Sequence, residues 1–377
     1  MRTARESRAY VLRNIYGGKA WADGQMLRCG NWLHARAWLP RAGGTQGTGT
    51  SPPATELGTD SGSSRPVLYR DPNAATVLAG SGVAALSPDY YAMTCPFVEY
   101  TVRSVVADAL MKDPTLAGSL LRLHFHDCFV QGCDASVLID STDDNKAEKD
   151  AGANKSLRGF EVIDRVKEAV ESHCPGIVSC ADILALVARD AVAMARGPYY
   201  FVPLGRRDGT RSVASDTFTT LPPPLGNVTL LAQMFAGVGL DLKDMVALSG
   251  GHTLGIAHCP SFKARVQNEL DTLDATLATS LGSVCSKGGD AGTAPFDRTS
   301  TRFDAVYYRE LQAKRGLLSS DQVLFEDPAT KDMVNAFSMN PYYFFQAFQQ
   351  GMLKMGQINL KEGDEGEIRL NCRVPNP

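Results

Sequence analysis

The sequence has no long hydrophobic run and no sustained strand pattern. None of its 377 residues lies in an apolar stretch that approaches the eighteen or so residues of a membrane span. The alternation of apolar and polar residues that marks half-buried strands is also missing. Because 44% of the residues are hydrophobic, the chain can still bury a large core. These features favour a soluble, mainly α-helical protein with no membrane contact.

Positive charge is scarce in the larger part of the chain. Residues 1–85 hold 10 Lys and Arg against 5 Asp and Glu, a net charge of +5. Residues 86–377 hold the remaining 28 against 36, a net charge of −8. A nucleic-acid-binding surface is basic, so we expect no nucleic-acid partner. An acidic body suits hard cations such as calcium, and it also serves simple solubility.

The first 85 residues have no clear signal peptide at Met1. Residues 43–64 are built from small and polar residues without hydrophobic periodicity, which predicts disorder. Only residues 75–86 resemble the end of a secretory signal, which normally begins close to Met1. We therefore expect residues 1–85 to be an atypical, disordered extension with a remnant signal peptide, followed by one domain over residues 86–377.

The paired Cys-x-x-Cys spacing of many zinc sites is absent from the cysteine-rich body. An even set of eight cysteines is typical of disulfides and of an oxidising compartment, but spacing does not choose among the many pairings. Zinc bound by Cys128 and Cys133 with His124 or His126 is the alternative. The eight are Cys95, Cys128, Cys133, Cys174, Cys180, Cys259, Cys285 and Cys372, and Cys29 is the ninth.

Apolar residues recur with a period near 3.6, which predicts helices. The segments are 97–111, 116–127, 159–173, 180–195, 241–250, 260–273, 303–316 and 341–356. The proline-rich residues 221–224 divide the body into lobes at about 86–220 and 221–350. A cofactor can lie between the helices of two such lobes.

The stretch LRLHFHDCF, residues 121–129, places charged and apolar residues on one predicted helix. Residues four apart share a helix face, so Arg122 and His126 should lie together, with Phe125 beside them. His124 and His126 point in different directions, which argues against one ion bound by both. The helix should end near Asp127.

Two further segments contain candidate ligands. Residues 127–136 offer Asp127, Asp134, Ser136 and the carbonyls of Val130 and Gly132 as oxygen ligands for a hard cation. A turn with side-chain hydrogen bonds explains the same residues equally well. His252 follows a glycine pair in VALSGGHTLG, residues 246–255, where a histidine can be structural or a ligand.

Together these motifs resemble the class III secretory plant haem peroxidases. The similarity runs from about Leu86 to Val374, and the blocks around His126 and His252 are its most specific parts. It implies a two-lobed helical fold with one haem b between the lobes, two Ca²⁺ ions and a monomer. It also implies oxidation of phenolic donors by hydrogen peroxide through high-valent iron intermediates. The location implied is extracellular, in the cell wall, or vacuolar.

The resemblance assigns roles to individual residues. It implies His252 as the axial iron ligand, Asp321 as the residue that hydrogen-bonds it, and Pro222 as a donor-binding residue. On the peroxide side it implies Arg122, Phe125, His126 and Asn154, with Glu148 in the same hydrogen-bond network.

The resemblance also implies two calcium sites. The first comprises Asp127, Val130, Gly132, Asp134 and Ser136, with Glu148 counted among its residues. The second comprises Thr253, Asp297, Thr299, Arg302 and Asp304. The segment 296–304 is one residue shorter than the family's, so Asp297 is the least well supported of these ligands.

The family's disulfide pattern, carried over, implies Cys95–Cys174, Cys128–Cys133, Cys180–Cys372 and Cys259–Cys285. Two glycosylation sequons are present, at Asn227 and at Asn154. We expect Asn227 to lie in a loop, and Asn154 to be buried and unmodified. The family's single tryptophan is replaced by Tyr200.

Three positions where better-known members carry aromatic residues at the haem edge are Gly152, Leu225 and Ser261. These departures bear on the choice of donor. A catalytically silent extracellular haem or calcium-binding protein is the alternative function. The presence of Arg122, His126, Asn154, His252 and Asp321 favours the enzyme.

Overall fold

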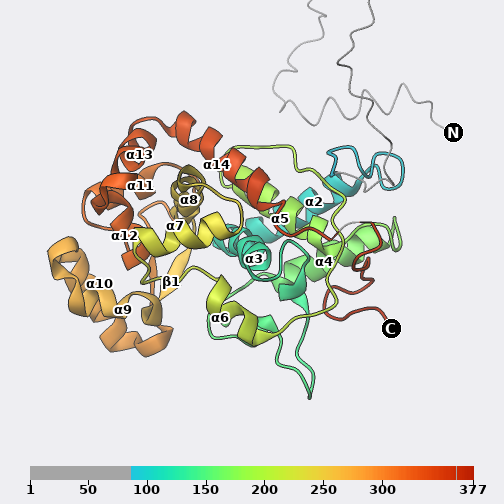
Figure 1. The fold of residues 1–377 in the computed structure, drawn as a ribbon, viewed down its shortest axis with the longest axis horizontal. Helices are drawn as coiled ribbons and strands as arrows, with labels where there is room; N and C mark the ends of the chain where they lie inside the picture. The colour runs from blue at the N-terminus through green and yellow to red at the C-terminus, as the bar shows by residue number, and fades with distance from the viewer. Residues whose placement is uncertain (1–85, 362) are drawn as a thin grey trace, which may run out of the picture. The chain divides into compact units, whose positions relative to one another are not determined.

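The computed structural model describes residues 86–361 and 363–377, which form helices joined by loops of varied length and one small strand pair (Figure 1). The predicted extension, with Cys29 and the remnant signal peptide, lies outside the described residues. The α-helices are α2 Val98–Lys112, α3 Leu116–Val130, α4 Phe160–Glu171, α5 Cys180–Met194, α6 Thr217–Thr220, α7 Val228–Gly237, α8 Leu242–Ser249, α9 Cys259–Asn268, α10 Ala275–Gly288, α11 Val306–Gln312, α12 Ser319–Glu326, α13 Pro328–Met339 and α14 Pro341–Met355. The mainly helical fold class is confirmed.

Two strands and two short 3₁₀ helices complete the elements used below. The strands β1 Ile256–His258 and β2 Thr293–Pro295 pair antiparallel, with Ala257 opposite Ala294. The 3₁₀ helices are η2 Glu148–Asp150 and η4 Gly250–Thr253. Within the described part of the chain, no helix combines the length and apolar character needed to cross a membrane.

Several helices begin at residues whose side chains accept a backbone N–H. Asp241 and Asp244 form a capping box at α8, Ser179 accepts from Asp182 N at α5, and Asn227 accepts from Leu230 N at α7. Such caps satisfy donors that the first helical turn leaves free. The prediction that Asn227 lies in a loop is confirmed, because it is the exposed, extended residue that directly precedes α7.

Two predicted helix ends are also wrong. α3 continues past Asp127 to Val130, because the Asp127 carboxylate accepts Ala135 N from the following loop and does not terminate the helix. α11 ends at Gln312, short of the predicted end at 316, since Lys314 adopts a φ of 58°, in the left-handed region that a helix excludes.

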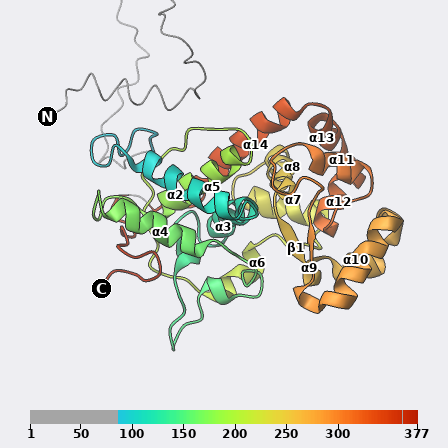
Figure 2. The same ribbon diagram turned by 180° about the vertical axis from the view of Figure 1, so that it is seen from behind.

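The main core surrounds α5. Every residue from Cys180 to Val192 is buried, as expected for a helix covered on all sides. α3, α2 and α4 pack on it, and they lie together in both views (Figures 1 and 2). This core extends to α14, while a smaller cluster around Phe262 and Leu281 lies under α9, α10 and the strands. The predicted division into lobes near residue 220 stays a prediction.

The start of α3 approaches the segment after η4 closely. A Cβ on Gly118 would lie 2.9 Å from the backbone nitrogen of Gly255, so only glycine permits this contact. α3 carries His126 and η4 carries His252. The close packing therefore places the two histidine-bearing elements against each other.

The C-terminal segment returns from α14 to α4 and α5. Arg373 forms an ion pair with Asp164 of α4 at 2.6 Å, and Cys372 is disulfide-bonded to Cys180. Asp208 lies beneath this segment and is fully buried. Its carboxylate accepts the backbone N–H groups of Cys180, Ala181 and Arg369.

Replacing Asp208 by Ala should lower the free energy of unfolding by about 3–5 kcal/mol, because three backbone donors lose their acceptor and the buried Arg369 guanidinium, whose Nε lies 4.0 Å from Asp208 Oδ2, loses its counter-charge. Urea unfolding with the disulfides intact measures the change. The control is Asp332→Ala, on the exposed face of α13, which should cost less than about 0.5 kcal/mol. A loss of under about 1 kcal/mol for Asp208→Ala would contradict the assignment.

Candidate active site

The residues predicted to share a helix face, Arg122 and His126, are in contact. Both lie on α3, and Arg122 Nε donates to His126 Nε2 over 3.0 Å. The His126 side chain is buried, and the Phe125 ring lies 5.6 Å from it in an edge-on arrangement. The helical prediction for this pair is confirmed.

Asn154 determines which nitrogen of His126 carries the proton. Its Oδ1 lies 2.6 Å from His126 Nδ1, while its amide nitrogen donates to the Glu148 carbonyl over 2.9 Å. A guanidinium can only donate, so His126 Nε2 accepts from Arg122 and Nδ1 carries the proton. The amide cannot be reversed without placing its oxygen against the Glu148 carbonyl. His126 is thus held in one tautomer.

Burial keeps the His126 ring neutral. Loss of solvent, followed by the positive charge of Arg122, holds the pKa of His126 well below its usual 6.5. Burial also lowers the pKa of Arg122 to about 10, which leaves the guanidinium charged at neutral pH. The site therefore presents a neutral base beside a permanent cation.

The loop after η2 holds the other end of Arg122. Nη1 donates to Ser156 Oγ over 2.9 Å, and Nη2 donates to the Ala153 carbonyl over 3.0 Å. The same loop contains Asn154, which is buried. The predicted burial of the Asn154 side chain is confirmed, and the absence of a glycan on it stays a prediction.

On the other side of the site, His252 is bound to a buried carboxylate. His252 Nδ1 lies 2.7 Å from Asp321 Oδ1. Asp321 also accepts the Tyr307 hydroxyl at 3.0 Å and the backbone N–H of Leu318. The Phe296 ring stacks on the His252 imidazole, with 4.2 Å between centroids and 6° between planes. These contacts fix the ring.

The donor set around His252 fits haem iron. Its Nε2 makes no hydrogen bond to any residue that the structure describes, while Nδ1 is occupied by Asp321. A neutral imidazole whose second nitrogen donates to a carboxylate is a typical ligand arrangement for iron. The element that carries His252 also packs against the helix that carries His126, since η4 contacts α3.

A cluster of buried oxygen atoms follows α3. Asp127, Asp134 and Glu148 lie together and are almost completely buried. Burial, then Asp134 and Glu148, raises the pKa of Asp127 well above its usual 3.8, and burial raises the pKa of Glu148 to about 8. Three carboxyl groups at one buried position either bind protons or bind a positive charge.

The same cluster contains oxygen atoms without partners. Ser136 Oγ and both carboxylate oxygens of Glu148 are buried and have no hydrogen-bond partner among the described residues. Native proteins rarely leave such atoms unpaired, and hard cations bind carboxylate and hydroxyl oxygens. The predicted ligands Asp127, Asp134 and Ser136 thus lie where a calcium ion fits. The Nζ of Lys361 is 3.3 Å from Asp134 Oδ2.

The second predicted calcium set is also brought together. Thr253 Oγ1 donates to Asp297 Oδ2 over 2.7 Å, and Thr299 Oγ1 donates to Asp304 Oδ1 over 3.1 Å. Arg302 follows in the same loop, where its N–H donates to the Thr299 carbonyl. Burial raises the pKa of Asp297 to about 6. The shorter spacing has not moved Asp297 away from the others.

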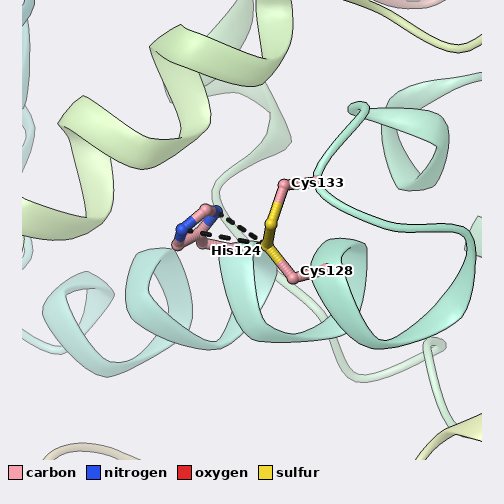
Figure 3. A group of neighbouring side chains, drawn as sticks. All are labelled: His124, Cys128 and Cys133. Carbon is pink, nitrogen blue, oxygen red and sulfur yellow. Dashed lines mark hydrogen bonds between the residues drawn. A yellow bond between two sulfur atoms is a disulfide. The ribbon is translucent and has the colours of Figure 1, made fainter. Parts of the chain in front are cut away.

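All four disulfide pairings implied by the resemblance are present. One of them bears on the zinc alternative, since Cys128 and Cys133 are bonded to each other beside His124 (Figure 3). No thiolate is left there to bind zinc. His124 is buried with its Nδ1 3.6 Å from Cys128 Sγ, and burial lowers the pKa of His124 to about 3. It is a neutral, structural histidine.

Several contacts at the site had no signal in the sequence. Tyr307, Phe296, Ser156 and Lys361 reach it from elements distant along the chain. None belongs to a local pattern with the residue it contacts. Pro222 is half-buried in the loop after α6, apart from the hydrogen-bonded groups described above.

Comparison with known proteins agrees with this geometry. The family model described as Peroxidase matches residues 102–340. Peroxidase 47 of Arabidopsis thaliana is 53% identical to the chain, over 77% of the chain and 89% of that protein. Peroxidase 64 of Arabidopsis thaliana is 48% identical, over 77% and 93%. Peroxidase 1 of Oryza sativa subsp. japonica is 47% identical, over 83% and 99%.

The buried His126 with the half-buried Arg122 beside it, the carboxylate-bound His252 and this extent of identity lead to one conclusion. The chain belongs to the peroxidase family, as a class III plant haem peroxidase that acts on hydrogen peroxide.

Proposed function

We propose that His126 and Arg122 act together in cleavage of the peroxide, and that His252 would bind the haem iron. The observation that carries this proposal is the hydrogen-bonded chain from Arg122 through His126 to Asn154. When bound, haem b supplies an iron atom that binds hydrogen peroxide and accepts its oxidising equivalents. Asp321 keeps the proton of His252 on Nδ1, which directs Nε2 to the iron and increases its donor strength.

His126 moves one proton. Its Nε2 lone pair would take the proton from one oxygen of hydrogen peroxide and return it to the other, departing oxygen, which would leave as water. Such transfer needs a base that is neutral at the working pH and a fixed orientation. Burial and Asn154 provide these two conditions.

Arg122 stabilises the negative charge that develops on the departing oxygen. A guanidinium fixed in a buried site interacts with such charge more strongly than it would in water, because the local dielectric constant is low. Its planar donors suit the task better than a lysine ammonium, which is a single mobile charge.

The donors in this proposal are small phenols, each oxidised by one electron. The Pro222 carbonyl serves as a binding group for the phenolic hydroxyl. Gly152 carries no side chain and faces open space, and Leu225 is exposed. A site edge with few aromatic residues accepts donors of varied shape.

Two calcium ions complete the proposed enzyme. The first is bound by Asp127, Asp134, Ser136 and the carbonyls of Val130 and Gly132, with Glu148 beside them. The second is bound by Thr253, Asp297, Thr299, Asp304 and the Arg302 carbonyl. The unpaired oxygens of Ser136 and Glu148 support the first site, and the shared hydrogen bonds around Asp297 support the second.

We further propose a monomer that is exported to the cell wall or the vacuole, with Asn227 glycosylated. Four disulfides suit an oxidising compartment, and Asn227 is exposed at the start of α7. A catalytically silent binding protein is not favoured, because the chain retains the residues for peroxide cleavage and its relatives are named as peroxidases.

Replacing His126 by Leu should slow the reaction with hydrogen peroxide at least ~10³-fold, because the substitution removes the group that moves the proton. Haem binding should persist, since His252 is unchanged. Stopped-flow absorbance in the Soret band measures the rate. The matched control is His173→Leu, at an exposed position, and it should react like the unaltered enzyme. A near-normal rate in His126→Leu would refute the role of His126.

Replacing Lys361 by Met should tighten calcium binding at the first site about tenfold, because it removes a positive charge next to Asp134. Calorimetric titration of the calcium-depleted enzyme with CaCl₂ measures the dissociation constant. The control is Lys354→Met, since Lys354 pairs with Asp244 of α8 and should leave the constant unchanged. Equal or weaker binding in Lys361→Met would show that Asp134 does not take part in the site.

A further inference from the structure

The loop that follows η2 contacts both residues of the proposed peroxide-cleaving pair. Asn154 binds His126 Nδ1, and two residues later Ser156 Oγ accepts from Arg122 Nη1. The Ala153 carbonyl, between η2 and Asn154, accepts from Arg122 Nη2. One short loop therefore fixes the base and the cation relative to each other.

Ser156 supplies the only side-chain acceptor that the described residues give Arg122 besides His126. Because the guanidinium is planar, acceptors at Nη1 and Nη2 fix its rotation as well as its position. Without Ser156, the only acceptors left to Arg122 among the described residues would be the Ala153 carbonyl and His126 Nε2. The His126 lone pair is also the group that must bind the peroxide proton, so Arg122 and peroxide compete for it. The Ser156 hydroxyl thus keeps the Arg122 guanidinium in place while His126 transfers the proton.

The sequence Asn154-Lys155-Ser156 also matches a glycosylation sequon. The side chains of its first and last residues both form hydrogen bonds within the protein. The Asn154 amide nitrogen donates to the Glu148 carbonyl, and the Ser156 hydroxyl accepts from Arg122. A glycan on the Asn154 nitrogen would have to be placed in a buried position. This sequon therefore supplies hydrogen bonds to His126 and Arg122.

We propose that Ser156 is a positioning residue for Arg122, which orients the guanidinium toward the departing peroxide oxygen. This rests on the function proposed for Arg122. Ser156 is half-buried at the surface of the core, so its substitution should leave the fold intact.

The test compares Ser156→Ala and Ser156→Thr in the haem-loaded enzyme, produced in a host without N-glycosylation. Ser156→Ala should react with hydrogen peroxide about tenfold more slowly, since one hydrogen bond to a charged group is lost. Ser156→Thr keeps the hydroxyl and should restore the rate to within about twofold. The second-order rate constant for the phenolic donor, measured separately from the reaction with peroxide, should not change in either variant.

A second measurement reports the guanidinium directly. Fluoride bound to the ferric iron is an anion that requires no proton transfer, and its affinity should fall about tenfold in Ser156→Ala. Carbon monoxide bound to the reduced iron is neutral, and its affinity should stay the same. A structural defect would weaken both ligands, and that result would overturn the proposal.

The variant Arg122→Leu distinguishes a failure of the role of Ser156 from a failure of the role of Arg122. If Arg122→Leu is impaired while Ser156→Ala keeps its peroxide rate and fluoride affinity within about twofold, the role of Ser156 is refuted and that of Arg122 stands. If Arg122→Leu itself reacts normally, the role of Arg122 fails, and the proposal for Ser156 fails with it. Ser156→Gly, which also removes the hydroxyl, replaces the alanine variant if the latter binds no haem.

Discussion

The hydrogen bond from His126 Nδ1 to Asn154 Oδ1 is the interaction on which the site depends. It assigns the proton of the ring, so that the Nε2 lone pair is available. The Asn154 amide is oriented in turn by the Glu148 carbonyl, at the start of η2. Burial then makes the neutral form of His126 the stable one. Arg122, which can only donate to Nε2, favours the same tautomer.

The same chain connects the site to the oxygen cluster. The backbone of Glu148 orients Asn154, whereas its carboxylate lies with Asp127 and Asp134. Asp127 directly follows His126 on α3, and Cys128 holds the end of that helix to Cys133. A cation at the cluster would neutralise the carboxylates that surround these supports. A change in the stability of η2 should therefore also change the orientation of His126, because Glu148 and Asn154 connect the two.

Sequence alone predicted what depends on local spacing. The period of 3.6 found α2, α3, α5 and α14, and the i, i+4 rule paired Arg122 with His126. It missed α6, α10, α12 and α13, which are short or rich in small and polar residues, and it missed α7, whose ten residues are apolar almost throughout and show no single apolar face. It also ended α3 too early. The disulfide pairs came from family resemblance, because spacing does not choose among pairings. Contacts such as Tyr307 with Asp321 and Ser156 with Arg122 depend on tertiary packing, which no local pattern encodes.

The central claim is that His126 works as a neutral base held in one tautomer. The pH dependence of the second-order rate constant for hydrogen peroxide tests it most directly, because that profile reports the ionisation of the free enzyme. With the pKa of His126 held well below 6.5, the rate should be constant from about pH 8 to about pH 6 and fall only in more acidic solution. A fall in rate centred at or above pH 6.5 would contradict the account.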